Sequence, residues 1–267
     1  MHSFAKYLYS PASIAEIFEL YTNHEDVVIL GNGSNVILTK ARYEETAFIV
    51  IKDDFKQIFQ VDEGIYAQAG CLLKSLSMYA YKHFLSGIET FFDVPASVGG
   101  AMIMNTSAYG DEIYDHVVYV DVIDTKYLKH RRIYKPDINY GYRYSMFKNA
   151  HFIILGACFG FSSKPQVEIK KKMDTIVIKR QSKLPNEPSA GSVFKRPKYN
   201  ITVGEMVENV GLKGFQIGGA KVSIKHGGVI VNIGNATGKD ILQVIDHIKK
   251  SIMIHYQVEL DLEQILV

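Results

Sequence analysis

Val94–Ile113, VPASVGGAMIMNTSAYGDEI, is the stretch on which the fold and the function of this 267-residue chain depend. Small residues fill most of it, including the Gly99-Gly100 pair. Such residues let the backbone approach a ligand closely and leave N–H groups that can point at it. Met102–Met104 offers an apolar wall, and Asn105 offers both a donor and an acceptor. A flat aromatic cofactor with hydrogen-bonding edges, such as a flavin, suits this surface; a glycine-containing loop between two strands is the alternative.

The overall composition is that of a globular protein. Hydrophobic residues make up 47% of the chain and charged residues 22%, and 30 basic against 28 acidic side chains leave a net charge of +2. This balance favours neither nucleic acid nor an anionic membrane as a partner. The longest apolar run, 152–161, is too short to span a bilayer, and the N-terminus lacks the apolar core of a signal peptide. We therefore expect a cytoplasmic protein of two or three sub-domains.

The sequence does not support a metal site, a redox-active cysteine pair or a catalytic triad. Cys71 and Cys158 lie far apart in apolar contexts, which predicts a reduced compartment. The histidines have no metal-ligand spacing, and no GxSxG nucleophile motif is present. His226 lies beside a Gly-Gly pair, but a lone histidine is more often a packing or surface residue.

Capping boxes and hydrophobic periodicity predict the helices. Ser13 with Glu16, Thr202 with Glu205 and Thr237 with Asp240 each predict a helix start. Two more helices are expected over 72–84 and 164–180. Buried or alternating apolar runs predict strands at 27–30, 36–38, 47–52, 65–69, 117–123 and 152–158.

The segment Gly31–Asn35 follows a predicted strand and can wrap backbone N–H groups around a phosphate. It is not a GxGxxG dinucleotide motif, because Val36 stands at the sixth position, and no Gly-Lys-Ser/Thr follows for a P-loop. An ordinary turn is the alternative reading.

Three polar residues are candidates for chemistry. Ser192 follows Gly191 in a loop bracketed by prolines, so its hydroxyl can be held to donate a proton; otherwise it caps a turn. Arg143, in a tyrosine-rich turn, can neutralise an anion or is a surface arginine. Glu263 lies among apolar residues near the C-terminus. It either points into a site or, as period-two alternation favours, lies on the solvent face of a strand.

Five motifs and the C-terminal end, in order along nearly the whole chain, resemble those of one enzyme family. Leu30–Asn35 is similar to LGGGSN, and Gly87–Glu89 with Val94–Gly110 is similar to GLE…GIPGxVGGAxxMNAGAYG. Tyr142–Ser145 matches YRxS, and Pro188–Pro197 is similar to PSAGSxFKNP. Gly211–Ala220 matches GLKGxxIGGA, and the last residues are similar to LxxEVxIIG, with the glutamate at Glu263. The family is that of the UDP-N-acetylenolpyruvoylglucosamine reductases, and the length resembles its shorter type.

The resemblance implies an α+β fold. A two-part FAD-binding domain of the vanillyl-alcohol-oxidase/PCMH type is expected over 1–52 and 53–184. A C-terminal α/β substrate-binding domain is expected over 185–267, with the last residues returning to the active site. The implied activity is NADPH-dependent reduction of UDP-N-acetylglucosamine enolpyruvate to UDP-N-acetylmuramate through FAD, in peptidoglycan precursor synthesis. The implied partner is this nucleotide sugar, bound by a monomer.

The resemblance also implies roles for individual residues. Arg143 and Glu263, the latter as a protonated acid, would stabilise an enolate-like intermediate, and Ser192 would deliver the proton. The implied FAD contacts are Gly31, Asn32, Gly33, Ser34, Asn35, Pro95, Ser97, Val98, Gly99, Asn105, Ser107 and Tyr109. The implied substrate contacts are Tyr142, Arg180, Lys183, Lys195 and Lys213, although each of these cations also has a plain surface-charge reading.

The chain departs from the family pattern at several positions. Asn32 and Ala96 replace usual glycines, Arg196 replaces an asparagine, and the segment before the first helix is short. Two other functions therefore remain as alternatives. One is another FAD-dependent oxidoreductase of the same fold, and the other is a flavin-free descendant that binds a nucleotide sugar.

Overall fold

The computed structural model describes residues 3–148 and 151–267, and the chain divides into two compact units. The larger unit comprises Tyr7–Asn32 and Glu45–Lys179, and the smaller unit comprises the chain up to Lys6, Gly33–Glu44 and Arg180–Val267. The predicted three-part division at 52 and 184 stays a prediction.

The helices are α1 (Ile14–Asn23), α2 (Leu73–Lys82), α3 (Val98–Met104), α4 (Gln166–Lys183), α5 (Val203–Asn209) and α6 (Gly238–Tyr256), with 3-10 turns η1 (Asp53–Phe55), η2 (Glu89–Phe91), η3 (Ile113–Asp115) and η4 (Lys135–Asp137). The strands up to the middle of the chain are β1 (Phe4–Tyr9), β2 (Val27–Leu30), β3 (Val36–Ile37), β4 (Arg42–Val50), β5 (Ile58–Val61), β6 (Gly64–Gln68), β7 (Leu85–Ser86), β8 (Ser107–Ala108), β9 (Asp111–Glu112) and β10 (Val117–Asp124). The remaining strands are β11 (Lys129–Tyr134), β12 (Tyr140–Gly141), β13 (Tyr144–Ser145), β14 (Phe152–Phe159), β15 (Ser162–Ser163), β16 (Ser189–Ser192), β17 (Gln216–Ile217), β18 (Ala220–Val222), β19 (Val229–Asn232) and β20 (Ile265–Leu266).

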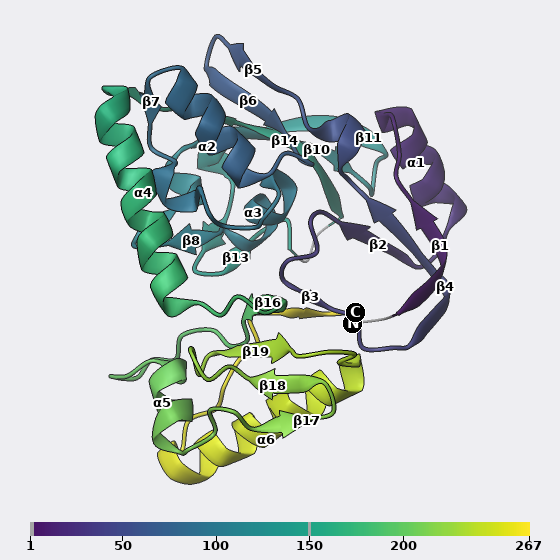
Figure 1. The fold of residues 1–267 in the computed structure, drawn as a ribbon. Helices are drawn as coiled ribbons and strands as arrows, with labels where there is room; N and C mark the ends of the chain where they lie inside the picture. The colour runs from purple at the N-terminus through teal and green to yellow at the C-terminus, as the bar shows by residue number, and fades with distance from the viewer. Residues whose placement is uncertain (1–2, 149–150) are drawn as a thin grey trace. The chain divides into compact units, whose positions relative to one another are not determined.

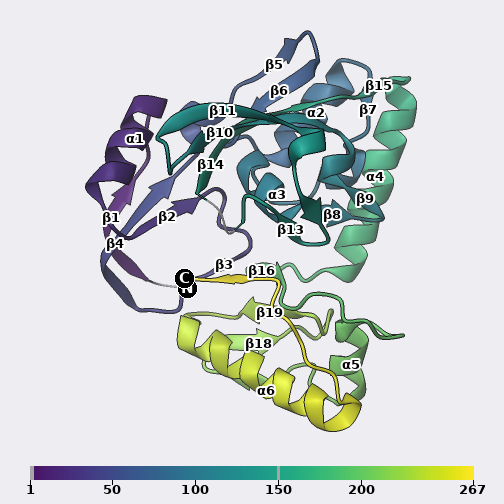
Figure 2. The same cartoon turned by 180° about the vertical axis from the view of Figure 1, so that it is seen from behind.

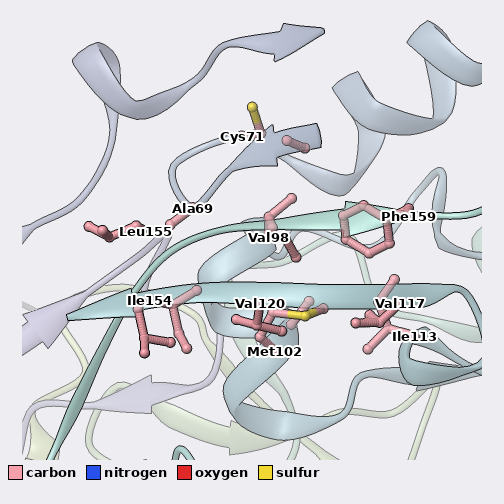
Figure 3. Close-up of a cluster of buried hydrophobic side chains, with 14 of the residues drawn as sticks. Ala69, Cys71, Val98, Met102, Ile113, Val117, Val120, Ile154, Leu155 and Phe159 are labelled. Carbon is pink, nitrogen blue, oxygen red and sulfur yellow. The ribbon is translucent and has the colours of Figure 1, made fainter. Parts of the chain in front are cut away.

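The larger unit is built on a five-stranded sheet of order β11-β10-β14-β6-β5, in which neighbouring strands are antiparallel (Figure 1). Short helix α3 packs against β14 and β6. Figure 3 shows Val98 and Met102 of this helix among Val120 of β10 and Ile154 of β14, and all four side chains are buried. The small residues of α3 allow this close approach: a Cβ at Gly99 would lie 3.1 Å from Cβ of Ala69.

A second sheet, of order β1-β4-β2, carries α1 beside it, and β2 runs parallel to β4 with Val27 opposite Ala47 (Figures 1 and 2). Ser13 is the N-cap of α1, as predicted, and its hydroxyl accepts from the Glu16 backbone N–H. The predicted capping box is incomplete, because the Glu16 carboxylate accepts from the N–H of Ala12 instead of that of Ser13. Strand β1 was not predicted from the sequence. Its alternating exposure identifies it as a strand with one face in solvent.

The smaller unit contains a four-stranded sheet of order β16-β19-β18-β17, covered on one face by α5 and α6. Thr202 and Thr237 cap these helices as predicted, each in a complete capping box. The apolar stripe of α6 (Ile241, Val244, Ile245, Ile248 and Ile252) is buried. Burying each such side chain favours folding by roughly 1.5–3 kcal/mol, so this stripe fixes the helix on the sheet.

The C-terminal residues pair with β3 and with the residues that follow it in the smaller unit. Strand β20 lies parallel to β3, with Ile265 opposite Val36. The carbonyl oxygen of Val267 accepts from the Thr39 backbone N–H at 2.8 Å and from the Tyr43 hydroxyl at 2.6 Å. Among the described residues, no helix has the length and apolar character needed to cross a membrane.

Candidate functional site

In the larger unit, the first two residues of the glycine loop lie against the start of α3. Asn32 donates from Nδ2 to the Pro95 carbonyl oxygen at 2.8 Å. A Cβ at Gly31 would overlap the hydroxyl of Ser97, which is itself the N-cap of α3 and accepts from the Gly100 N–H at 3.3 Å. Two segments predicted to contact the same cofactor, 31–32 and 95–99, are thus brought together in one unit.

Asn105 ends α3 in a left-handed conformation with φ of +43°, and it is fully buried. Its Nδ2 donates to the Glu112 carboxylate at 2.8 Å and to the Gly141 carbonyl oxygen at 2.9 Å. Its Oδ1 has no hydrogen-bond partner among the described residues. A buried acceptor without a donor destabilises the folded state. The Oδ1 atom of Asn105 can therefore accept a hydrogen bond from a ligand or a water molecule.

Ser107 and Tyr109 lie on the hairpin formed by β8 and β9. Ser107 pairs with Glu112, and the connecting residues Tyr109 and Gly110 have φ of +53° and +90°. Positive φ at both central residues is typical of the tight turns that suit hairpin twist. The turn leaves the Tyr109 ring 45% exposed, on the surface where a ligand can reach it.

Arg143 occupies the turn between β12 and β13, as the tyrosine-rich sequence predicted, and its φ is +55°. Its guanidinium lies 5.3 Å from the centre of the Tyr142 ring, and Nη1 donates to the Ser107 hydroxyl at 2.6 Å. The hydroxyl of Ser145 donates to the Ile103 carbonyl oxygen at 2.9 Å, which ties this hairpin to α3. A left-handed non-glycine residue held by such contacts is typical of functional positions.

In the smaller unit, residues 192–195 and 261–263 run side by side. The Glu263 N–H donates to the Val193 carbonyl oxygen and the Lys195 N–H donates to the Asp261 carbonyl oxygen, each at 2.9 Å. Asn35 of the glycine loop donates from Nδ2 to the Glu263 carbonyl oxygen at 3.1 Å. Ser192, Glu263 and Asn35 are therefore brought together although they are far apart in sequence.

The alternation reading for Glu263 is wrong. Residues 261–263 form an irregular segment with one isolated bridge, Phe194 to Leu262, rather than a regular strand. Glu263 is half-buried and its neighbour Gln264 is buried, at 6% exposure, so polar residues do not alternate outward here. The backbone pairing with 192–195, which local sequence does not reveal, decides which side chains are covered.

The predicted substrate cations are also in the smaller unit. Lys213 forms an ion pair with Glu208 at 2.9 Å, and Arg180 and Lys183 lie on the last turn of α4. Burial lowers the pKa of His226, and the positive charges of Lys213 and Lys183 lower it further. The Gly228 carbonyl oxygen accepts from the Val193 N–H, so the turn that carries His226 lies beside the segment that carries Ser192.

A cavity of about 180 Å³ adjoins the same segments, lined in part by Gly33, Pro188, Ala190 and Gln264. Gly33 has φ of +66°, and no described atom lies within 4 Å of where its Cβ would stand. The backbone of the glycine loop is therefore open on that side, as close approach to a ligand requires.

Comparison with known proteins agrees with these segments. The model of the UDP-N-acetylenolpyruvoylglucosamine reductase C-terminal domain matches residues 183–267, and that of an FAD binding domain matches residues 6–126. The chain is 52% identical to the UDP-N-acetylenolpyruvoylglucosamine reductase of Francisella tularensis subsp. tularensis, over 99% of this chain and 94% of that protein. The chain belongs to the UDP-N-acetylenolpyruvoylglucosamine reductase family. It is also 39% identical to the reductase of Thermosipho melanesiensis, over 95% of this chain and 86% of that protein.

A solved structure supports the same reductase family. The crystal structure of the enzyme from Thermus caldophilus matches 97% of this chain and 91% of its own, with a TM-score of 0.83 and 28% identity. Together with the two domain models, this confirms the predicted family, the α+β fold class with an FAD-binding domain, and FAD as the cofactor.

The reductase-family residues fit a flavin nucleotide. Within the larger unit, residues 31–32 and the start of α3 offer backbone groups, the Ser97 hydroxyl and no acidic side chain, which suits a diphosphate. The unpartnered Oδ1 of Asn105 suits a hydrogen-bonding ring edge. The individual flavin and substrate contacts expected from the sequence stay predictions, as do the catalytic roles. Ser192 and Glu263 are neighbours in the smaller unit, and Arg143 belongs to the larger unit.

Proposed function

We propose that the chain reduces UDP-N-acetylglucosamine enolpyruvate to UDP-N-acetylmuramate, with NADPH as the reductant and FAD as the bound cofactor. Family membership supports this reaction, which belongs to peptidoglycan precursor synthesis. The structural observation that carries it is the backbone hydrogen bond from the Glu263 N–H to the Val193 carbonyl oxygen, because it holds Glu263 beside the residue that directly follows Ser192. The nucleotide sugar is the proposed small-molecule partner, and the cytoplasmic location and monomeric state stay proposals.

The chain's residues supply charge stabilisation and a proton. FAD, when bound, supplies the hydride that it has received from NADPH. Once the terminal carbon of the vinyl ether has gained hydride, negative charge builds on the adjacent carbon and its carboxylate. Arg143 stabilises this charge electrostatically and Glu263 by hydrogen bonding. Ser192 then donates its hydroxyl proton to the adjacent carbon, which completes the reduction.

The polar contacts of these residues support the proposal. Arg143 is held by Ser107, so little side-chain freedom is lost when it meets an anion. We assign Tyr142, Arg180, Lys183, Lys195 and Lys213 to substrate binding; the four cations suit the diphosphate and the carboxylate, and the Tyr142 hydroxyl can form a hydrogen bond. Residues 185–267 are the proposed substrate-binding domain.

Separate measurement of the two half-reactions tests the role of Ser192. Ser192→Ala is expected to leave the rate of flavin reduction by NADPH within about twofold of wild type. It should slow flavin reoxidation by the enolpyruvyl nucleotide by about 100-fold or more, since general acid catalysis contributes on this scale. Ser163→Ala, which alters an exposed serine of β15, is the matched control. Equal loss in both half-reactions would refute the proton-donor role.

The absorbance spectrum distinguishes the remaining functions. A protein that is yellow as purified and is bleached by NADPH cannot be a flavin-free nucleotide-sugar binder. Reoxidation by the enolpyruvyl nucleotide and not by simple sugars distinguishes the reductase from another FAD-dependent oxidoreductase of the same fold.

A further inference from the structure

Strand β16, which carries Ser192, contains a bulge. Ser189 lies opposite Val231, and Ser192 lies opposite Val229. Between these two pairs, β16 has two residues where β19 has one. Gly191, inside the bulge, has φ of +72°. A bulge of this kind breaks the ladder locally and redirects the side chain that follows it. Here the redirected side chain is that of Ser192, which is exposed.

The bulge leaves two carbonyl groups outside the regular ladder, and the Gln264 side chain meets both. Its Nε2 donates to the Ala190 oxygen at 3.1 Å and to the Gly191 oxygen at 3.3 Å. An amide nitrogen has two N–H groups, so both contacts can form at once. The residue is 6% exposed, which keeps water from replacing these bonds.

Gln264 and its backbone neighbour hold the residues on either side of Ser192. The Gln264 side chain binds the two residues before the serine, and the Glu263 N–H binds the carbonyl oxygen of Val193 directly after it. We propose that Gln264 is a positioning residue that fixes the β16 bulge and thereby aims the Ser192 hydroxyl at the carbon to be protonated. This inference rests on the proposed function of Ser192.

The two contacts depend on the amide group of Gln264, because an aliphatic side chain at this position would have no donor for the two carbonyl groups. A reacting group displaced by about 1 Å can lose on the order of 100-fold in rate, so the two hydrogen bonds of a buried amide suffice to affect proton transfer.

Gln264→Met tests the proposal, because methionine retains the length of the side chain without its donors. Reoxidation of the reduced flavin by the enolpyruvyl nucleotide is expected to slow by about 10- to 100-fold. Reduction by NADPH should stay within about twofold, and the melting temperature within a few degrees. The rate ratio between H₂O and D₂O for reoxidation should rise, because proton transfer becomes slower. Gln216→Met, which removes an exposed Nε2 contact to the Gly218 carbonyl oxygen, is the matched control and should leave all four measurements unchanged.

Gln264→Glu adds a readout that a general packing defect would not produce. The protonated carboxyl group has one O–H donor, whereas the carboxylate has none and repels the two carbonyl oxygens. The reoxidation rate of this variant should therefore rise as the pH is lowered, while that of Gln264→Met should show no such added dependence. Identical pH profiles for the two variants would contradict the hydrogen-bonding role.

A double-mutant cycle separates this inference from the proposed function. If Gln264 acts through Ser192, then Ser192→Ala/Gln264→Met should reoxidise no more slowly than Ser192→Ala alone. If Ser192→Ala reoxidises slowly but Gln264→Met reoxidises at the wild-type rate, the inference fails and the role of Ser192 stands. If Ser192→Ala reoxidises normally, the proposed function itself fails. Equal slowing of both half-reactions by Gln264→Met would also overturn the inference.

Discussion

Nη1 of Arg143 donates to Oγ of Ser107 at 2.6 Å, so a residue predicted for catalysis is held by a residue predicted for flavin binding. The Ser107 carbonyl oxygen also accepts from Nη1, at 3.4 Å. Ser107 is fixed in turn by its pairing with Glu112, whose carboxylate accepts from Asn105. The end of α3, the β8–β9 hairpin and the Arg143 turn therefore form one hydrogen-bonded assembly within the larger unit.

Ser107→Ala is expected to loosen Arg143 without removing its charge. A hydrogen bond to a charged group contributes about 1.5–3 kcal/mol, so reoxidation by the enolpyruvyl nucleotide should slow by roughly 10- to 100-fold. Stopped-flow absorbance of the flavin measures this rate. Arg143→Ala should be slower still, and Ser107→Thr, which keeps a hydroxyl, should recover most of the loss. A Ser107→Ala rate equal to wild type would show that the contact does not orient the guanidinium.

Gly31→Ala is expected to weaken FAD binding, because the new Cβ would overlap the Ser97 hydroxyl that caps α3. Loss of such a cap costs about 0.5–2 kcal/mol, and the loop must shift as well. Fluorescence titration of the apoprotein with FAD measures the effect. Gly160→Ala is the matched control, since its Cβ would meet Val118 at an ordinary 3.5 Å. In a Ser97→Ala background the overlap disappears, so the added cost of Gly31→Ala should shrink there.

The sequence predicted most regular elements because their signals are local. The three helix starts at Ser13, Thr202 and Thr237 are each encoded within four residues of chain, and all three residues are N-caps in the structure, the two threonines in complete capping boxes. Helix α3 was not predicted as a helix. Its Gly99-Gly100 pair has poor helix propensity, and the helix forms because Val98 and Met102 are buried against the sheet.

The candidate site was predicted less completely, because its contacts join distant parts of the chain. Motif resemblance selected Ser192 and Glu263, and their backbone pairing is visible only in the fold. The contact between Ser107 and Arg143 spans 36 residues, and the contacts of Gln264 with Ala190 and Gly191 span more than 70. One local signal could have indicated Gln264: it is a polar residue at a valine position of the C-terminal motif.

Acidification is expected to destabilise the fold in two steps. Burial lowers the pKa of His116 below its usual 6.5, despite the opposing charges of Asp111 and Asp115. The unfolded chain therefore binds the proton first, and stability present above pH 6.5 is lost as the pH falls below that value. Burial by itself raises the pKa of Glu89, but hydrogen bonds, the Ser86 contact first among them, and the Lys172 charge together lower it. The contribution of Glu89 to the free energy of unfolding is therefore lost as the pH falls below 4.5.

Melting temperatures between pH 8 and pH 4 check this prediction. The wild-type melting temperature should change little from pH 8 to pH 7 and fall from pH 6.5 downward. In His116→Gln the fall between pH 6.5 and pH 5 should be smaller, because this side chain takes up no proton. In Glu89→Gln, only the fall in melting temperature below pH 4.5 should differ from that of the wild type. A profile that is flat to pH 5 in the wild type would contradict the assignment to His116.

Both thiols are expected to resist modification in the folded protein. Cys71 is 1% exposed and Cys158 is fully buried, and burial raises the pKa of Cys71 to about 12 and that of Cys158 to about 11. Because the thiolate is the reactive species, each is about a thousandth or less ionised at pH 8. Iodoacetamide at pH 8 should therefore label neither residue until the chain unfolds in guanidinium, when both react. Ser163→Cys, which places a thiol on exposed strand β15, should be labelled promptly and gives the reference rate. Labelling of Cys71 or Cys158 at that reference rate would mean that the core around it opens far more often than its burial implies.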